Sequence, residues 1–142
     1  MNVSKFTQKS IAAVENCEKL AYEYGNQEIE QEHLLVGLLT LEDSLILKLI
    51  EKMEINTGHF LTRAEKALQK RVKVSGGNLT VGKDLNKVLI TAEDEAKAMG
   101  DEYVSVEHIF LSMINHPNKE SKAIFNEYGI TRERFLTALS TV

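Results

Sequence analysis

The chain contains no tryptophan and almost no proline or cysteine, and the last two absences each exclude a class of structure. Its 142 residues include no tryptophan, one proline (Pro117) and one cysteine (Cys17). A single cysteine cannot form an internal disulfide, which is typical of a reducing compartment, so we expect a cytoplasmic protein. Because proline breaks helices, its near absence leaves almost the whole chain free to form them.

Two further absences narrow the possible partners. No apolar run approaches the roughly 20 residues that a membrane-spanning helix requires, and the first residues, MNVSKFTQKS, lack the apolar core of a signal peptide. The net charge of −4 argues against a strong binder of nucleic-acid phosphates. The only basic cluster, Lys70, Arg71 and Lys73, contains no aromatic residue and is interpreted as a solvated linker. We therefore expect neither membrane nor nucleic acid as a partner.

The stretch GGNLTVGKD has the spacing of a phosphate-binding loop at Gly77, Gly82 and Lys83. Such a loop follows a buried strand and continues with Ser or Thr, which binds Mg²⁺. Here Asp84 follows the lysine, and the charged segment QKRVKVS precedes the glycines. The stretch therefore predicts a helix start, capped by Thr80 or a neighbour, where Asp84 complements the helix dipole.

No other pattern indicates catalysis or metal binding. None of the histidines has a second histidine four residues away, and one cysteine cannot complete a zinc site. No arrangement of Ser, His and an acid forms a recognisable nucleophile motif. We expect no catalytic residue, no metal and no cofactor. The histidines are His33, His59, His108 and His116.

The most informative feature of the sequence is an internal repeat. When the chain is shifted by 75 residues, residues 6–67 match residues 81–142 without a gap. Cys17 then falls on Ala92, which indicates a small, buried packing position for the thiol. We expect one domain over residues 1–142, in which a linker of about residues 70–80 joins two units. Identical pairs include Glu18 and Glu93, Gly25 and Gly100, Glu32-His33 and Glu107-His108, and Ile55 and Ile130.

Each unit is predicted to form four helices. Apolar residues recur at helical spacing in four segments per unit, Gly25 supplies a left-handed stop for the first helix, and neither half shows convincing strand alternation. The prediction is an all-α fold of eight helices, arranged as two pseudo-symmetric four-helix repeats.

The duplicated Glu-His pairs allow two interpretations. In the simpler one, each glutamate favours the dipole at a helix start and each histidine makes local capping bonds. In the other, Glu32 and Glu107 lie beside a cleft and receive a cationic or polar group from a partner. The sequence favours the structural role but leaves both open.

Three features together resemble a known family. These are FTQKS near the start, the Glu-His pair that opens an apolar helix in each half, and the segment AEDEAKAMGDEYVSVEHIFL. They are similar to the N-terminal domain of Clp-type AAA+ unfoldases over essentially the whole chain. Glu30-Gln31 and Ser105-Val106 depart from the Gly-Thr that is typical of the ClpC type, so the resemblance favours the ClpB disaggregase type.

The resemblance implies a binding module and not an enzyme. Two AAA+ modules elsewhere in a hexameric parent would bind ATP and Mg²⁺, while this domain, a monomer in isolation, would bind unfolded or aggregated polypeptide in a groove between the repeats. A DnaK-type chaperone system would cooperate with the parent. The implied substrate-binding residues are the polar Thr7, Asp101 and Glu107 and the apolar Leu85, Val88 and Leu89.

The ClpC type is the alternative within the resemblance. There the two Glu-His glutamates, Glu32 and Glu107 here, would receive phosphoarginine, and the domain would dock adaptor proteins. An acidic Glu30 beside Glu32 would repel a phosphate, which favours the ClpB type.

Overall fold

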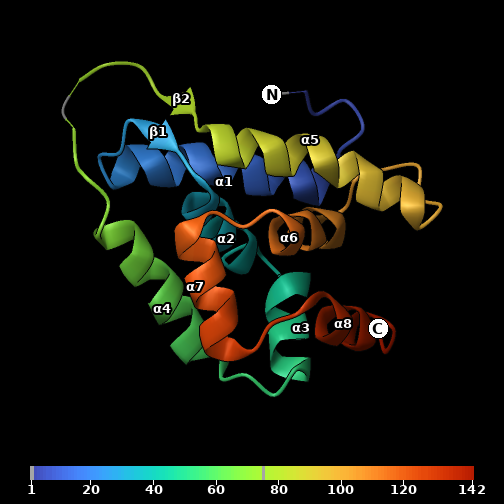
Figure 1. Ribbon diagram of the computed structural model, residues 1–142. Coiled ribbons are helices and arrows are strands. Elements are labelled where there is room, and N and C mark those ends of the chain that lie inside the picture. The colour runs from blue at the N-terminus through green and yellow to red at the C-terminus, as the bar shows by residue number, and fades with distance from the viewer. Residues whose placement is uncertain (1, 75) are drawn as a thin grey trace.

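The computed structural model describes residues 2–74 and 76–142, which form eight helices and two short strands (Figure 1). The prediction of a helical fold is confirmed. In chain order the elements are α1 (Gln8–Glu23), β1 (Glu28–Ile29), α2 (Gln31–Leu39), α3 (Leu45–Lys52), α4 (Thr57–Gln69), β2 (Thr80–Val81), α5 (Lys83–Ala98), α6 (Val106–Asn115), α7 (Lys119–Tyr128) and α8 (Arg132–Leu139).

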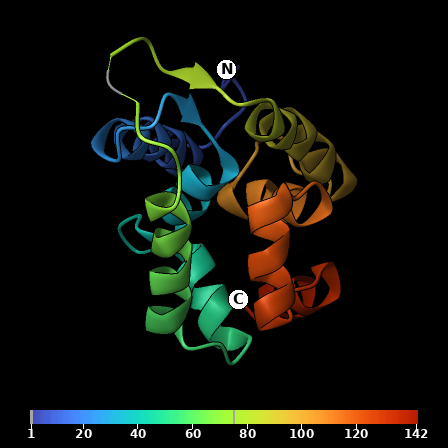
Figure 2. The same ribbon diagram turned by 60° about the vertical axis from the view of Figure 1, so that its left-hand side comes forward.

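The two halves of the chain have the same order of helices and lie side by side (Figure 2). The helices α1 and α5 each span 16 residues and begin 75 residues apart, at Gln8 and Lys83. Contacts between the halves come in reciprocal pairs: α3 packs on α6 and α7 on α2, while α4 packs on α7 and α8 on α3. The equivalent helices α2 and α6, which carry the Glu-His pairs, contact each other, so the pseudo-twofold axis passes between them.

Two short parallel pairings, which the sequence did not predict, join the halves to each other. Ile29 pairs with Val81 in the β1–β2 ladder, and Phe6 forms an isolated bridge with Val104. The repeat register maps one pairing onto the other. Each pairing ties the residues before the first helix of one half to the residues before the second helix of the other. The repeats are therefore interlocked, and not merely stacked.

The stretch with phosphate-loop spacing has a different structure from a phosphate-binding loop. β2 lies between Gly77 and Gly82, where such a loop would wrap around phosphates, and Thr80 pairs with Glu28. The N-cap of α5 is not Thr80 but its neighbour Gly82, two residues later, which has no side chain to make a capping bond. Asp84 lies in the first turn of α5, as predicted.

A continuous apolar core runs through both halves. The ring of Phe110 on α6 packs against Phe125 of α7 and Phe135 of α8, with centroids 5.6 and 4.8 Å apart. Cys17 is buried on α1 as the repeat predicted, and burial raises the pKa of its thiol. Among the described residues, no helix is long and apolar enough to cross a membrane.

Candidate functional site: two carboxylate pockets

Both Glu-His histidines are capping residues. The Nδ1 atom of His33 accepts a hydrogen bond of 2.9 Å from the backbone N–H of Glu30, the N-cap of α2. In α6 the Nδ1 atom of His108 accepts the corresponding bond, 2.8 Å, from the N–H of Ser105. Each histidine thus satisfies a backbone donor that a helix start would otherwise leave unpaired. For the histidines, the simpler of the two interpretations, local capping bonds at a helix start, is therefore confirmed.

The outer nitrogens of these two histidines have different partners. His33 Nε2 lies 2.9 Å from Asn26 Oδ1, whereas His108 Nε2 lies 2.8 Å from the carboxylate of Asp101. Because Nδ1 of His33 accepts, its proton resides on Nε2 and is donated to Asn26. Burial, together with the charge of Arg71, lowers the pKa of His33 to about 4, so this imidazole is neutral at physiological pH.

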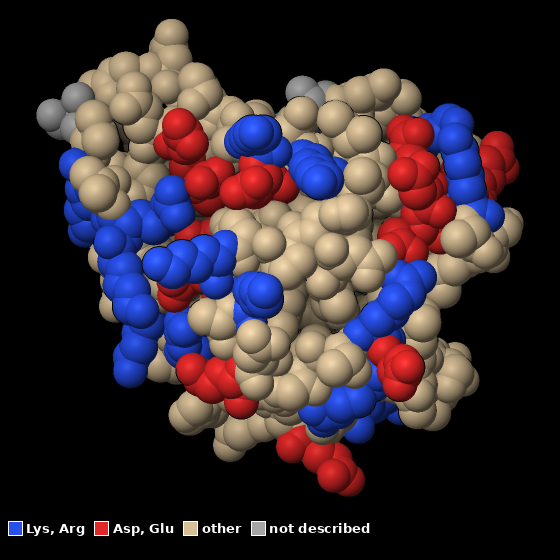
Figure 3. All heavy atoms as spheres, in the orientation of Figure 1, with Lys and Arg blue, Asp and Glu red and all other residues tan. Residues whose placement is uncertain are grey.

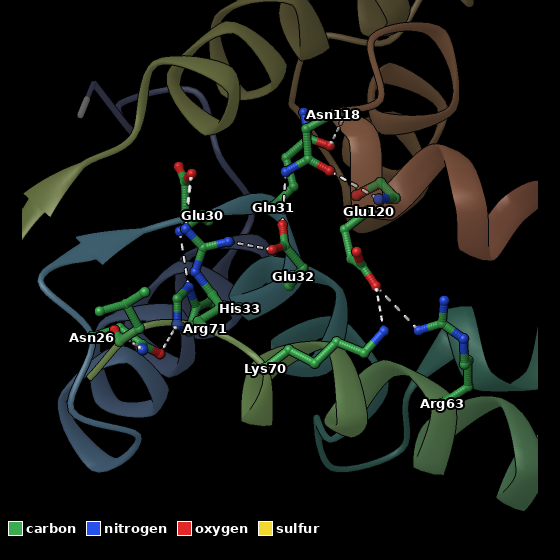
Figure 4. A network of polar contacts seen from close by, with 12 residues as sticks. Asn26, Glu30, Gln31, Glu32, His33, Arg63, Lys70, Arg71, Asn118 and Glu120 are labelled. Atoms are coloured by element: carbon green, nitrogen blue, oxygen red, sulfur yellow. Dashed lines mark hydrogen bonds and ion pairs between the residues drawn. The ribbon is translucent and has the colours of Figure 1, made fainter.

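The glutamates of the two pairs face two cavities. The cavity at the start of α2, here called the Glu32 pocket, has a volume of about 640 Å³. Only 2% of the Glu32 side chain is exposed, and its carboxylate accepts hydrogen bonds from Arg71 Nη1 and, at 2.7 Å, from Asn118 Nδ2 (Figure 4). Arg71 Nη2 also reaches Glu30, at 3.3 Å. The pocket is lined by residues 26–28, Glu30, Glu32, Ala67, residues 70–72, Val74, Asp84 and residues 118–120.

Beside the Glu32 pocket, amide side chains join the two halves. Gln31 Nε2 donates to the backbone oxygens of Asp84 and His116, at 3.2 and 2.8 Å. Its Oε1 accepts from the backbone N–H of Asn118 at 2.9 Å. Asn118 is also the N-cap of α7, where Oδ1 accepts from Ser121 N–H at 2.8 Å. These hydrogen bonds attach the start of α7 to the start of α2 beside the pocket.

Glu30 occupies the rim of the same pocket against α5. Burial raises the pKa of its carboxyl, and Glu32 adds to this effect, while Arg71 opposes it. One carboxylate oxygen lies so close to Gly82 that a Cβ atom there would be 1.5 Å from it. The glycine at the N-cap of α5 thus leaves room for the Glu30 side chain.

The corresponding cavity at the start of α6, the Glu107 pocket, has a volume of about 290 Å³. It brings together Thr7 and Glu107, two of the residues that the family resemblance implied, and it lies between the halves. Among residues 2–74 and 76–142, no side chain forms a hydrogen bond or ion pair with the Glu107 carboxylate. The pocket is lined by Thr7, Lys9, Leu41, Asp43, Ser44, Leu45, Ser105, Val106 and Glu107.

The remaining implied substrate-binding residues lie elsewhere. Leu85 and Val88 are 1% and 0% exposed and belong to the core, so a ligand would reach them only if α5 moved. Leu89, 5% exposed, borders a small separate hollow, and Asp101 is the exposed partner of His108. The structure does not gather these four residues with Thr7 and Glu107, and their roles in binding stay predictions.

The residue that the sequence interpretation missed is Arg71. It was interpreted as part of a solvated basic linker, but its side chain is only 28% exposed and pairs with Glu30 and Glu32. Figure 3 shows one group of basic side chains over α4 and the segment that follows it, next to a group of acidic side chains, with further basic side chains elsewhere on this face. No group of three or more potential metal ligands is found in the described part of the chain.

The fold and the paired pockets define a duplicated helical module, and comparison with known proteins identifies it. The family model described as "Clp repeat (R) N-terminal domain" matches residues 5–128. The chain belongs to this family. The matched residues make up most of the 142 residues and correspond to an N-terminal module, not to an ATPase module.

Similar proteins include the chaperone ClpB of Nitratidesulfovibrio vulgaris, 37% identical over the whole chain, and ClpB of Porphyromonas gingivalis, 34% identical over 98% of the chain. The chain spans only 17% and 16% of their lengths. Among solved structures, the Hsp104 N-terminal domain from Candida albicans superposes with a TM-score of 0.82 at 22% identity, covering 95% of this chain and 89% of that one. A ClpV N-domain in complex with a VipB peptide gives a TM-score of 0.73 at 20% identity, covering 97% and 89%. These likenesses support a ClpB-like chaperone N-domain.

Proposed function

We propose that this domain binds unfolded or aggregated polypeptide in the Glu107 pocket, as the N-terminal module of a cytoplasmic, hexameric, ATP-dependent ClpB-type disaggregase. ATP and Mg²⁺ would act in the AAA+ modules of that parent, and the parent would work with a DnaK-type chaperone system. The isolated domain is proposed to be a monomer without a cofactor of its own.

The observation that carries the proposal is the composition of the Glu107 pocket. Leu41, Leu45 and Val106 give it an apolar lining, while the Glu107 carboxylate has no partner from the described residues. An apolar cavity with a few polar groups can hold a side chain of an extended polypeptide and orient its backbone. Because an unfolded chain must be ordered on binding, the affinity should be modest, about micromolar or weaker.

The comparisons add support for this mode of binding. A ClpV N-domain of the same fold was solved with a VipB peptide. This chain shares its fold, and the pocket lies at the meeting of the two halves, where residues from α6 and from the α2–α3 segment converge.

The second candidate is the ClpC-type function, in which Glu32 and Glu107 receive phosphoarginine or the domain docks an adaptor. The presence of a carboxylate at the same place in both repeats favours it. Against it, Arg71 already pairs with Glu32, and Glu30 adds a further negative charge that would repel a phosphate.

Leu45→Glu tests the first proposal. Leu45 is the first residue of α3, where an added acidic residue suits the helix dipole, so the fold should tolerate the change. Ile90→Glu is the matched control, because Ile90 is 63% exposed on α5 and does not line the Glu107 pocket. In a fluorescence anisotropy titration with a permanently unfolded, phosphate-free polypeptide, Leu45→Glu should weaken binding by at least about tenfold, a loss of about 1.4 kcal/mol.

Two results would count against this assignment. Equal weakening by both variants would mean that the surface as a whole, and not the pocket, binds polypeptide. Binding only of a phosphoarginine peptide, lost in the double variant Glu32→Ala and Glu107→Ala, would establish the ClpC-type function instead.

A further inference from the structure

A further pocket, here called the α3–α8 pocket, lies between the end of α3 and α8, two helices from different halves of the chain (Figure 1). Its volume is about 690 Å³. In the repeat register, α3 corresponds to α7 and α8 corresponds to α4, so the contact of α7 with α4 is its equivalent. The two contacts can therefore be compared residue by residue. The lining of the α3–α8 pocket includes Met53, Glu54, Glu133, Arg134, Ala138 and Thr141.

In the equivalent α4–α7 contact, an aromatic ring of the chain itself occupies the space between the helices. The ring of Tyr128, the last residue of α7, packs edge-to-face on Phe60 of α4, with ring centroids 5.0 Å apart. Its hydroxyl forms a hydrogen bond with His59 Nδ1. The internal repeat thus shows which kind of side chain this contact accommodates: an aromatic ring with a polar tip.

The α3–α8 pocket is open because smaller residues stand at the equivalent positions. Met53 takes the place of Tyr128, and two positions of the facing helix also lose a long side chain. The space that larger side chains occupy in one contact is therefore available to a ligand in the other. The equivalent residues, with the α4–α7 side first, are Tyr128 and Met53, Arg63 and Ala138, and Lys66 and Thr141.

Arg134 forms a fixed wall of the α3–α8 pocket, at the position equivalent to His59. Its Nη1 atom donates to the backbone oxygens of Tyr128 and Gly129, at 3.1 and 2.6 Å, and Nη2 donates to that of Met53. Of the five guanidinium N–H groups, two make no hydrogen bond with the residues that the structure describes. A guanidinium group held in this way can stack on an aromatic ring and donate to a phenolic oxygen.

Two carboxylates stand at the opening of the pocket. Glu54 and Glu133 line it and are exposed, whereas the equivalent residues of the other half are glycines. Their oxygens can accept hydrogen bonds from the backbone N–H groups of an extended chain. A polypeptide that inserts an aromatic ring and leaves its backbone at the opening therefore matches the pocket.

The position of the pocket favours an unfolded chain as the partner. Tyrosine side chains are largely buried in folded proteins, so an accessible one is typical of an unfolded segment. Leu45 lines the Glu107 pocket and Lys52 lines the α3–α8 pocket, and both lie on α3, seven residues apart. Such residues share a helix face and are separated by about 10.5 Å along the axis, which about three residues of an extended chain can span.

We propose that the α3–α8 pocket is a subsite for a tyrosine side chain of an unfolded polypeptide. The ring packs against Met53 and its hydroxyl accepts a hydrogen bond from Arg134, in the way that Tyr128 is held in the other half. The inference rests on the proposed function for the class of partner, an unfolded polypeptide, but it does not require binding in the Glu107 pocket.

Two unfolded, phosphate-free peptides that differ only in tyrosine versus alanine at one position test the proposal on the wild-type domain. In a fluorescence anisotropy titration, the tyrosine peptide should bind at least about tenfold more tightly, because the pocket buries its ring. At saturation it should also shift the NMR signal of the Met53 methyl group through the ring current, while the alanine peptide should not. Equal affinities, or an unshifted Met53 signal with the tyrosine peptide, would overturn the proposal.

Met53→Tyr provides a second, independent measurement, because it should fill the pocket as Tyr128 fills its equivalent. In this variant the preference for the tyrosine peptide should disappear. Met99→Tyr is the matched control: it makes the same exchange at a residue that is 40% exposed and does not line the pocket, so the preference should remain. A preference that survives in Met53→Tyr would refute the assignment. If Met53→Tyr does not fold, the Met53 signal of the wild type decides alone.

Two further outcomes separate this proposal from others. Leu45→Glu should weaken both peptides and leave the ratio of their affinities unchanged; binding of both without a tyrosine preference would overturn this proposal and leave the proposed function standing. A preference for tyrosine in a domain that Leu45→Glu does not affect would overturn only the role of the Glu107 pocket. A Met53 signal that shifts with domain concentration in the absence of peptide would show that a second copy of the chain fills the pocket, and would refute the proposal.

Discussion

Acidification should destabilise this domain through one histidine. The N–H of Glu30 and the oxygen of Asn26 hold His33 in its neutral form, and its pKa is lowered from 6.5 to about 4. A protonated ring would direct an Nδ1–H toward the Glu30 N–H and place a charge in the core, since the His33 side chain is fully buried. In the unfolded chain the same histidine binds its proton at the ordinary pKa.

The magnitude follows from the difference between these two pKa values. A histidine whose pKa is lowered by folding contributes stability that is present above pH 6.5 and is lost as the pH falls toward about 4. At about pH 5 the loss of unfolding free energy relative to neutral pH should be roughly 2 kcal/mol, and it should approach about 3 kcal/mol below the folded-state pKa.

The assay is urea unfolding at several pH values, compared with His33→Gln. Glutamine at this third position of a helix can accept the same N-cap bond but does not titrate. Whatever the stability of the variant at neutral pH, the unfolding free energy of the wild type minus that of the variant should fall by about 2 kcal/mol on going to about pH 5. If wild type and variant lose stability in parallel, the assignment of acid sensitivity to His33 is wrong.

Three further substitutions test the Glu32 pocket by urea unfolding. Gly82→Ala should cost about 1–3 kcal/mol, because its methyl group collides with the Glu30 carboxylate; no loss would show that Glu30 has another position available. In the His33→Gln background, where this histidine no longer titrates, ionisation of Glu30 should lower the unfolding free energy as pH rises from 4.5 through the raised pKa of its carboxyl. Glu30→Gln should remove this loss, and an unchanged pH profile would contradict the direction of the pKa shift. Asn118→Ala removes the α7 cap and a donor to Glu32, so it should cost about 2 kcal/mol or more, whereas a near-neutral effect would mean that water replaces the amide.

The sequence predicted the helices well because their signals are local. Apolar spacing lies within each helix, and capping residues lie next to it: Asn56 caps α4 and Thr131 caps α8. The repeat also located equivalent positions, since the Glu-His pairs open α2 and α6 as expected. Such signals require no knowledge of how distant segments meet.

The sequence could not predict the features that depend on distant contacts. The β1–β2 ladder is two residues long in each strand, too short for an alternation pattern, and its partners are about fifty residues apart. The ion pair of Arg71 with Glu32 joins the segment between α4 and β2 to α2. In the sequence, Arg71 looks like part of an ordinary basic linker. The burial of Leu85 and Val88 depends on how α5 packs, which helical spacing alone does not determine.

The most direct test of the account is an amide chemical-shift titration of the domain with a permanently unfolded, phosphate-free polypeptide. The account predicts shifts that cluster around the Glu107 pocket, at Thr7, Leu45 and residues 105–107. Shifts confined to Leu85, Val88 and Leu89, or no shifts at millimolar polypeptide, would contradict the claim that this pocket binds unfolded chains.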